Sequence, residues 1–242
     1  SSGIVWSGTL TVNGILDLAT GGQVRQGGSQ GAIVANSLLV HATQGQSHFL
    51  LDHSDNAVNT FSSQADQTKN TSAPQYGDVE FTNSKALAIA PITAREYRSA
   101  GAATIPLTSS QAVVAGDLLL RNKGGNMTLA QNVQTLGSDI ILVTDGVLNH
   151  VGGSILSPGG SGKWQVWAST WVGETRGGLS GTPDPVANYY NCAYGSACAA
   201  SIPSTGNHFI YAAVPTVTVT ADDVAWVLGT PDPTYSFTTV GL

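Results

Sequence analysis

Short apolar segments with polar residues at alternate positions recur along the first two thirds of the chain. They are Gly8–Gly14, Ile15–Leu18, Ala32–Val40, Asp78–Phe81, Ala86–Ile89, Asp117–Leu120, Asn126–Leu129, Asp139–Val143 and Ser154–Leu156. Gly, Asn, Ser and Thr separate the segments, and alternation bounded by such residues is typical of half-buried β-strands. Because no helical period intervenes, we expect an all-β solenoid in which each turn buries one stripe against the next. Solenoids usually serve as spacers and display surfaces.

Two stretches interrupt this pattern, at residues 46–76 and 94–112. The polar run Gln64–Pro74 has no periodicity, which predicts a loop protruding from one edge of the solenoid. Ala94–Ala100 predicts a short helical turn before Gly101. Apart from these two stretches, we expect residues 1–163 to form the successive strands of the solenoid.

The composition changes at residues 164–213, where aromatic residues and prolines concentrate. Such a stretch does not look like another regular turn, so we expect a cap or junction that covers the open end of the core. The alternative is that its aromatic rings stack on sugars or on a partner surface. The candidate contact residues are Trp164, Trp167, Trp171, Tyr189 and Tyr190.

Residues 214–242 begin with the alternating segment Pro215–Thr220. So short a stretch does not bury a core alone, so we expect a truncated β-hairpin at the start of a following domain. The chain also begins inside a β-pattern and shows no signal peptide. We interpret the sequence as a slice of a longer polypeptide.

Charged residues make up only 10% of the 242 residues, whereas soluble domains usually contain roughly 25%. This scarcity is usual in secreted β-solenoids. The net charge is −6 and the nine Lys and Arg residues are scattered, which argues against nucleic-acid partners and anionic membranes. No apolar run approaches the roughly 18 residues of a membrane span, so we expect no membrane insertion.

The two cysteines, Cys192 and Cys198, flank the turn-forming residues Tyr194–Ser196. Their spacing suits a local disulfide, which would stabilise by roughly 2–2.5 kcal/mol and would indicate an oxidising compartment. Two free thiols are the alternative. A zinc site requires about four ligands, and this pair does not offer them.

No catalytic, metal or cofactor site is expected. Gly159–Lys163 resembles the end of a phosphate-binding loop, but Trp164 stands where a hydroxyl residue is needed. The same residues lack the last glycine of a nucleophile elbow. The densest group of possible metal ligands is His41, His48, His53, Asp52 and Asp55, without a recognised ligand spacing.

Polysaccharide-cleaving solenoids place several aspartates on neighbouring turns of one face, as general acid and base or around calcium. In this sequence the aspartates are spread singly along the chain, and a polysaccharide-active enzyme is kept as the alternative function. They are Asp17, Asp52, Asp78, Asp117, Asp139 and Asp145, with Asp222–Asp223 as the one adjacent pair.

Asparagine has two expected roles. Asn70 and Asn126 begin Asn-x-Thr/Ser sequons and are possible glycosylation sites, with Asn70 in the loop that a modifying enzyme would reach. Asparagines near turns are expected to satisfy loop backbone groups rather than bind ligands. They are Asn13, Asn36, Asn83, Asn122 and Asn149.

Several of these segments together resemble a known family. The ladder motifs Gly116–Leu120, Gly125–Leu129 and Asp139–Gly146 resemble the filamentous-haemagglutinin-like exoproteins of two-partner secretion. The series from Trp164–Ser169 through Gly206–Tyr211 to Pro215–Ala221 looks like the end of such a protein's β-helix passing into a small MBG-type repeat domain, which Gly229–Tyr235 would begin.

The resemblance implies a right-handed parallel β-helix over residues 1–163. It further implies export through an outer-membrane secretion partner to the extracellular face of a Gram-negative cell, and adhesion to a host-cell, glycan or matrix receptor. We therefore expect a monomeric, non-catalytic stalk or display fragment of an adhesin. A pure spacer, with binding elsewhere in the parent protein, is a further alternative.

Overall fold

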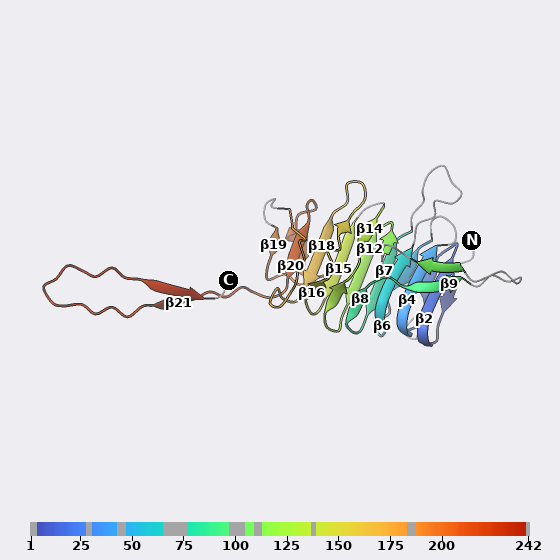
Figure 1. Cartoon of the computed structure of the whole chain (residues 1–242), viewed down its shortest axis with the longest axis horizontal. Helices are drawn as coiled ribbons and strands as arrows, with labels where there is room; N and C mark the ends of the chain where they lie inside the picture. Colours follow the sequence, from blue (N-terminus) through green and yellow to red (C-terminus); the bar gives the residue numbers. More distant parts are fainter. Residues whose placement is uncertain are drawn as a thin grey trace, which may run out of the picture.

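Strands dominate the structure, a computed structural model that describes residues 4–27, 31–42, 47–64, 77–96, 105–108, 113–136, 139–182 and 187–240. Within these ranges there is no α-helix, and one short 3-10 helix, η2, covers Ala197–Ser201. The strands form long parallel sheets that lie side by side along the body of the molecule (Figure 1). The prediction of an all-β chain is therefore confirmed.

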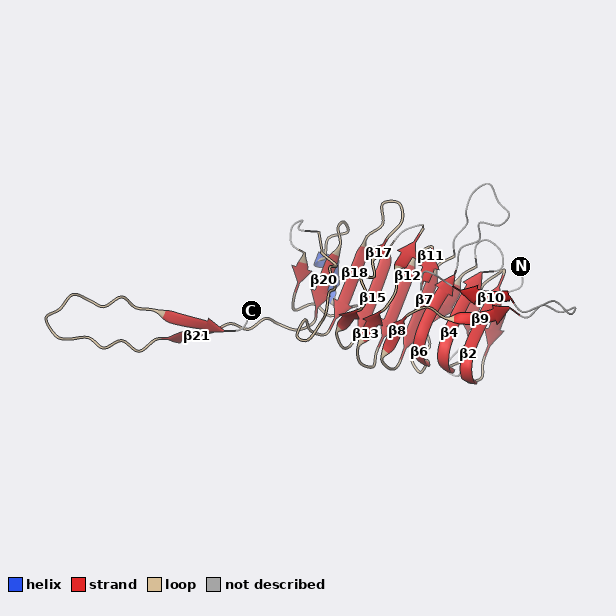
Figure 2. Ribbon diagram, viewed as in Figure 1, coloured by secondary structure: helices blue, strands red, loops and turns tan. Residues whose placement is uncertain are grey.

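Three parallel sheets make up the body (Figure 2). The long sheet contains, in order, β1 (Ile4–Trp6), β3 (Val24–Gln26), β5 (Phe49–Leu51), β7 (Val79–Asn83), β12 (Leu118–Asn122), β15 (Ile140–Thr144), β18 (Trp164–Ala168), β20 (His208–Tyr211) and β19 (Asn188–Tyr189). The second sheet contains β16 (Leu148–His150), β13 (Met127–Leu129), β8 (Leu87–Ile89), β6 (Ala57–Gln64), β4 (Ile33–Ala42) and β2 (Leu10–Thr20). The third contains β11 (Val113–Ala115), β14 (Val133–Thr135) and β17 (Leu156–Ser157).

The chain visits these sheets in a repeating order. From β1 to β8 it alternates between the long sheet and the second sheet, and from β11 to β18 it passes through the third, long and second sheets in rotation. Up to β18, each return to the long sheet adds a strand parallel to the preceding one. Because the connection between two successive long-sheet strands runs through the other sheets, those strands are parallel without a helical crossover.

Alternation along each long-sheet strand sends every second side chain into one continuous core. The register stacks Phe49, Val79, Leu118, Ile140 and Trp164 in one column, and all five are buried. The apolar positions recognised in the sequence thus become stacked columns, which remove their surface from water turn after turn.

A second inward column is polar. Asn83, Asn122 and Thr144 stack in register and are buried. The Asn83 side chain accepts the amide hydrogen of Val58 (2.8 Å) and donates to the carbonyls of Val58 (3.0 Å) and Lys85 (2.7 Å). For Asn83 and Asn122, the expected role in satisfying loop backbone groups is confirmed.

The structure corrects the prediction for residues 46–76. β5 and β6 lie in this stretch, and both pair with their neighbours in parallel. β6 lacked a clear alternation because three consecutive residues, Phe61, Ser62 and Ser63, are all buried, so both faces of the strand are covered there. The polar run after Gln64 lies mostly outside the described residues.

Two further predictions about strands were wrong in detail. The segments Gly8–Gly14 and Ile15–Leu18 form a single strand, β2, whose register against β4 shifts between Val12 and Ile15. Ala94–Glu96, expected in a helical turn, belongs to strand β9 (Thr93–Glu96), which pairs antiparallel with β10 (Ile105–Thr108). Residues 97–100 lie outside the described residues.

The long sheet does not end at residue 163. β18 pairs with β15 over five residues, and β20 pairs with β18, both in parallel and in register. The aromatic residues of β18 and β20 therefore continue the sheet, contrary to the expectation that this stretch is not a regular turn. Trp164 and Phe209 continue inward columns of apolar residues from earlier strands, and Tyr211 continues the column of Asn122, Thr144 and Ala168.

Beyond the sheets, β21 (Thr218–Ala221) and β22 (Phe237–Val240) form an antiparallel hairpin with all strand residues exposed. Figure 1 shows it extending away from the body. A lone two-stranded hairpin is at best marginally stable in water. The predicted hairpin is present, and its membership of an MBG-type domain stays a prediction.

Candidate functional site

Three aspartates that are distant in sequence lie immediately before three consecutive strands of the long sheet, β7, β12 and β15. The amide of Asp117 donates to Oδ1 of Asp78 (2.9 Å), and the amide of Asp139 donates to Oδ1 of Asp117 (3.1 Å). Oδ1 of Asp139 accepts the amide of Lys163 (3.0 Å), while its Oδ2 lies 2.5 Å from Nζ of that lysine. We call Asp78, Asp117 and Asp139 the acid column. The sequence interpretation that these acids are spread singly is therefore wrong for three of them.

A cavity of about 320 Å³ lies along the acid column. Its other walls include Glu80, Leu119 and Ile141 on the outer face of the long sheet. Burial, reinforced by the nearby charge of Asp52, raises the pKa of Glu80. An acid with a raised pKa beside ionisable aspartates is an arrangement that glycosidases use, so this cavity is a candidate site for chemistry.

The bonding of the acid column indicates a structural role. Each carboxylate supplies an acceptor to the amide of the next strand, as turn-forming Asp does. Asp117→Ala should therefore lower the free energy of unfolding by about 1 kcal/mol, whereas Asp117→Asn, which keeps the acceptor oxygen, should change it by less than about 0.5 kcal/mol. Urea titration followed by circular dichroism measures both values. Equal losses for the two variants would contradict this role.

The five aromatic residues expected to contact a ligand have different environments. Trp164 is 3% exposed and packs edge-on against Phe209 in the core, so it presents almost no surface to a ligand. Trp167 is 4% exposed and packs edge-on against Tyr194 on the outer face of the sheet. Burial therefore removes Trp164 from the contact residues and leaves Trp167 only an edge.

Trp171 and Tyr190 lie together at the far end of the core. Both rings contact Tyr211, and their own centroids are 5.0 Å apart. Tyr190 is 39% exposed, and Trp171 packs partly buried against the main core with Leu179. Tyr189 is half-buried against His208. We call Trp171 and Tyr190 the end cluster. It covers part of the core surface and also presents an aromatic face.

A charged network sits beneath the end cluster. The hydroxyl of Tyr211 donates to the Glu174 carboxylate (2.8 Å), and Arg176 donates to that hydroxyl (2.5 Å) and to Glu174 (2.6 Å). Burial, followed by the hydrogen bond to Glu174, raises the pKa of Tyr211. The Arg176 guanidinium lies 4.0 Å from the ring centre of Phe209, a cation–π distance. The network joins the residues after β18 to the last turn of the core.

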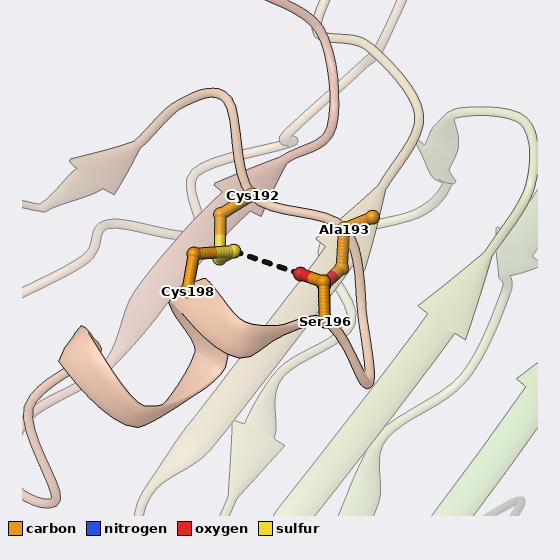
Figure 3. Close-up of a disulfide and its surroundings, with 4 residues drawn as sticks. All are labelled: Cys192, Ala193, Ser196 and Cys198. Atoms are coloured by element: carbon orange, nitrogen blue, oxygen red, sulfur yellow. Dashed lines mark hydrogen bonds between the residues drawn. A yellow bond between two sulfur atoms is a disulfide. The ribbon is translucent and has the colours of Figure 1, made fainter.

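The predicted disulfide between Cys192 and Cys198 is present, with the Cα atoms 5.6 Å apart. Figure 3 shows the closed loop, in which the Ser196 hydroxyl lies 2.8 Å from Sγ of Cys198. We call residues 192–198 the disulfide loop. Together with Tyr189, it packs against Val143, Trp167 and Ile210, so a second apolar cluster forms on the outer face of the long sheet.

Removing the disulfide should loosen this cover. In the chain-entropy model the double substitution Cys192→Ala/Cys198→Ala lowers the free energy of unfolding by about 2 kcal/mol. Urea titration of oxidised chain and double variant measures the difference. The exposed Ser201→Ala is the control, expected within about 0.5 kcal/mol of the parent. A double variant as stable as the control would contradict the prediction.

The possible metal ligands do not assemble. Nδ1 of His41 lies 2.7 Å from Asp17, His48 lies 3.2 Å from Asp78, and His53 accepts the amide of Asp55. No group of three or more His, Cys, Asp or Glu residues able to hold a metal occurs among the described residues. No helix in the same part of the chain is long and apolar enough to cross a membrane.

Of the two sequons, the structure describes only the one at Asn126. Asn126 is exposed, but its Oδ1 accepts the amide of Val147 (3.1 Å), and Met127 beside it is buried. Asn70 lies outside the described residues. Neither observation tests glycosylation, which stays a prediction.

Sequence reasoning did not identify Arg121, Tyr194 and Glu80. They line the hollows of the outer face, but each is a single polar or aromatic residue whose neighbours come from other turns. Only the strand register would have revealed them. The chain matches no protein-family model, no curated protein and no solved structure.

Proposed function

We propose that this chain is a non-catalytic stalk and display segment of a large secreted or surface-exposed bacterial adhesin. Its body would be a right-handed parallel β-helix, with residues 164–213 closing the core and the hairpin beginning a further domain. The parent protein would be exported through an outer-membrane partner and would support attachment to cells, glycans or matrix. These assignments follow from the resemblance of the sequence motifs to filamentous-haemagglutinin-like exoproteins.

One observation carries the non-catalytic part of this proposal. The three carboxylates of the acid column accept backbone amides at the next strand, and that of Asp139 also pairs with Lys163. Such acceptors stabilise a stack of turns, which is what a rigid spacer requires. The scarcity of charge and the disulfide both suit an extracellular location.

Attachment would use the exposed part of the end cluster. Tyr190 and Trp171 offer an aromatic edge on which sugar or peptide groups can pack, with weak affinity for each site and higher avidity from many copies. Beads coated with the oxidised chain should therefore be retained on some surface of a panel of cells, glycans and matrix proteins. Tyr190→Ala should reduce retention, and the exposed Tyr235→Ala in the hairpin is the matched control.

The retention result also separates the display proposal from the spacer alternative. A spacer should give no retention above that of bare beads on any surface. Deletion of residues 46–76 is unsuitable for this purpose because it removes β5 and β6 with their buried residues. A deletion limited to residues 65–76 spares both strands.

The second candidate function is a polysaccharide-active enzyme. The observation that favours it is the raised pKa of Glu80 in a cavity shared with the acid column. Glu80 would be the general acid. Incubation with acidic and neutral polysaccharides, followed by chromatography of the products, tests it. Cleavage that disappears in Glu80→Gln would establish the enzyme, and intact polysaccharide would remove it.

A further inference from the structure

A second hollow of about 230 Å³ lies where the disulfide loop meets the outer face of the long sheet. Its lining includes Arg121, Asp145, Trp167, Ser169 and Tyr194. The sheet supplies Arg121 from β12 and Trp167 from β18, and the disulfide loop supplies Tyr194. The hollow is smaller than the roughly 300–1,000 Å³ of sites for drug-sized ligands, which favours a ligand with a single ring.

Arg121 is the unusual member of this lining. It occupies the outer column between Thr82 and Val143, and its guanidinium carbon lies 5.6 Å from the ring centre of Tyr194. Its Nε is buried and has no hydrogen-bond partner among the described residues. Arg121 also forms no ion pair with a carboxylate of the described residues. A buried donor without an acceptor is costly, and a missing ligand group or ion is one explanation.

The walls around Arg121 are fixed by contacts. Tyr194 packs edge-on against Trp167 at 5.4 Å, and the disulfide holds both ends of its loop. The Ser169 hydroxyl donates to the backbone carbonyl of Asp145. The Asp145 side chain is exposed, and its carboxylate forms no ion pair within the described residues. The cation of Arg121, the aromatic side chains of Tyr194 and Trp167 and the carboxylate of Asp145 therefore line one small space.

We propose that this hollow binds a carboxylate-bearing monosaccharide unit, such as a uronic or sialic acid residue of a glycan. The planar guanidinium of Arg121 would pair with the sugar carboxylate, the fork geometry that arginine provides. The apolar face of the sugar ring would pack on Tyr194, and Asp145 would accept hydrogen bonds from hydroxyl groups. This inference rests on the proposed display function, because it names the class of glycan that this surface would recognise.

Calorimetric and saturation-transfer NMR titrations of the oxidised chain test the proposal. The probes are glucuronate, galacturonate and N-acetylneuraminate, with glucose and galactose as neutral controls at equal ionic strength. We expect millimolar binding of at least one acidic sugar and at least tenfold weaker binding of the neutral ones. Equal binding of acidic and neutral sugars, or no binding of any, would overturn the proposal.

Variants locate the site. Arg121→Gln and Tyr194→Ala should each weaken binding at least tenfold, with folding verified by circular dichroism. Arg25→Gln, on the outer face of the same sheet and bonded to Gln23, should leave it unchanged. Asp145→Asn, at an exposed position, should strengthen acid binding a few-fold by removing a like charge. Loss of binding in Arg25→Gln, or weaker binding in Asp145→Asn, would contradict this site.

The two proposals fail separately. Retention of coated beads without binding of soluble acidic sugars would reject this site and leave the display function standing. Binding of acidic sugars by a chain whose beads are retained nowhere would reject the display function and keep the site.

Discussion

Replacement of Phe61 by alanine is expected to lower the free energy of unfolding by about 3–5 kcal/mol. The Phe61 side chain is fully buried, and its ring stacks on that of Phe81 with centroids 4.8 Å apart and planes 9° apart. Phe61 belongs to β6 of the second sheet and Phe81 to β7 of the long sheet, so the pair joins two sheets across the core. The strands are fixed by pairing on both sides, which prevents them from collapsing into the cavity.

Urea titration followed by far-ultraviolet circular dichroism measures this loss. Phe237→Ala is the matched control, because that ring is 67% exposed in the hairpin and should change stability by less than about 0.5 kcal/mol. A loss at Phe61 no larger than that at Phe237 would contradict a continuous core between the sheets.

Asn83→Ala is expected to lower the free energy of unfolding by about 2–4 kcal/mol, although it removes little apolar surface. The substitution leaves the amide and carbonyl of Val58 and the carbonyl of Lys85 without their partner. Asn83 is fully buried, so water does not replace these hydrogen bonds without entering the core.

The matched control is Asn59→Ala. Asn59 is exposed and donates to the exposed Asn36, so its loss should cost less than about 0.5 kcal/mol. The same urea titration compares the two variants. Similar stabilities for Asn83→Ala and Asn59→Ala would show that the buried asparagine column does not hold the turns together.

Strands with strict alternation of apolar and polar residues could be predicted from the sequence, whereas strands without it could not. The segment Asp117–Leu120 is an example: its buried and partly exposed residues alternate, and it forms most of β12. β6 escaped prediction because Phe61, Ser62 and Ser63 are buried in succession, two of them polar, so its sequence does not alternate between apolar and polar residues. The aromatic residues of β18 suggested an irregular cap, but large rings fit inward columns near the end of the core.

The candidate sites depend on register, which a single sequence does not reveal. Asp117 is 39 positions after Asp78 and 22 before Asp139, because one turn carries the β9–β10 insertion and the next does not. No fixed period therefore connects the three acids. The disulfide could be predicted because its six-residue separation is local, whereas the approach of Tyr194 to Arg121 depends on how that loop folds back.

Both hollows lie on the outer face of the long sheet. The acid column and Glu80 line one, and Arg121 and the disulfide loop line the other. The first is rich in negative charge and the second contains an arginine without an acid partner among the described residues. An acidic glycan is therefore expected at the second hollow and repelled from the first.

Attachment without chemistry is the central claim. The most direct test incubates the oxidised chain with every glycan that retains coated beads and follows the products by chromatography and mass spectrometry over a day. The account predicts retained glycans of unchanged length, with no new reducing or unsaturated ends. Shortened products that accumulate with time and vanish in Glu80→Gln would contradict it and identify the acid-lined cavity as an active site.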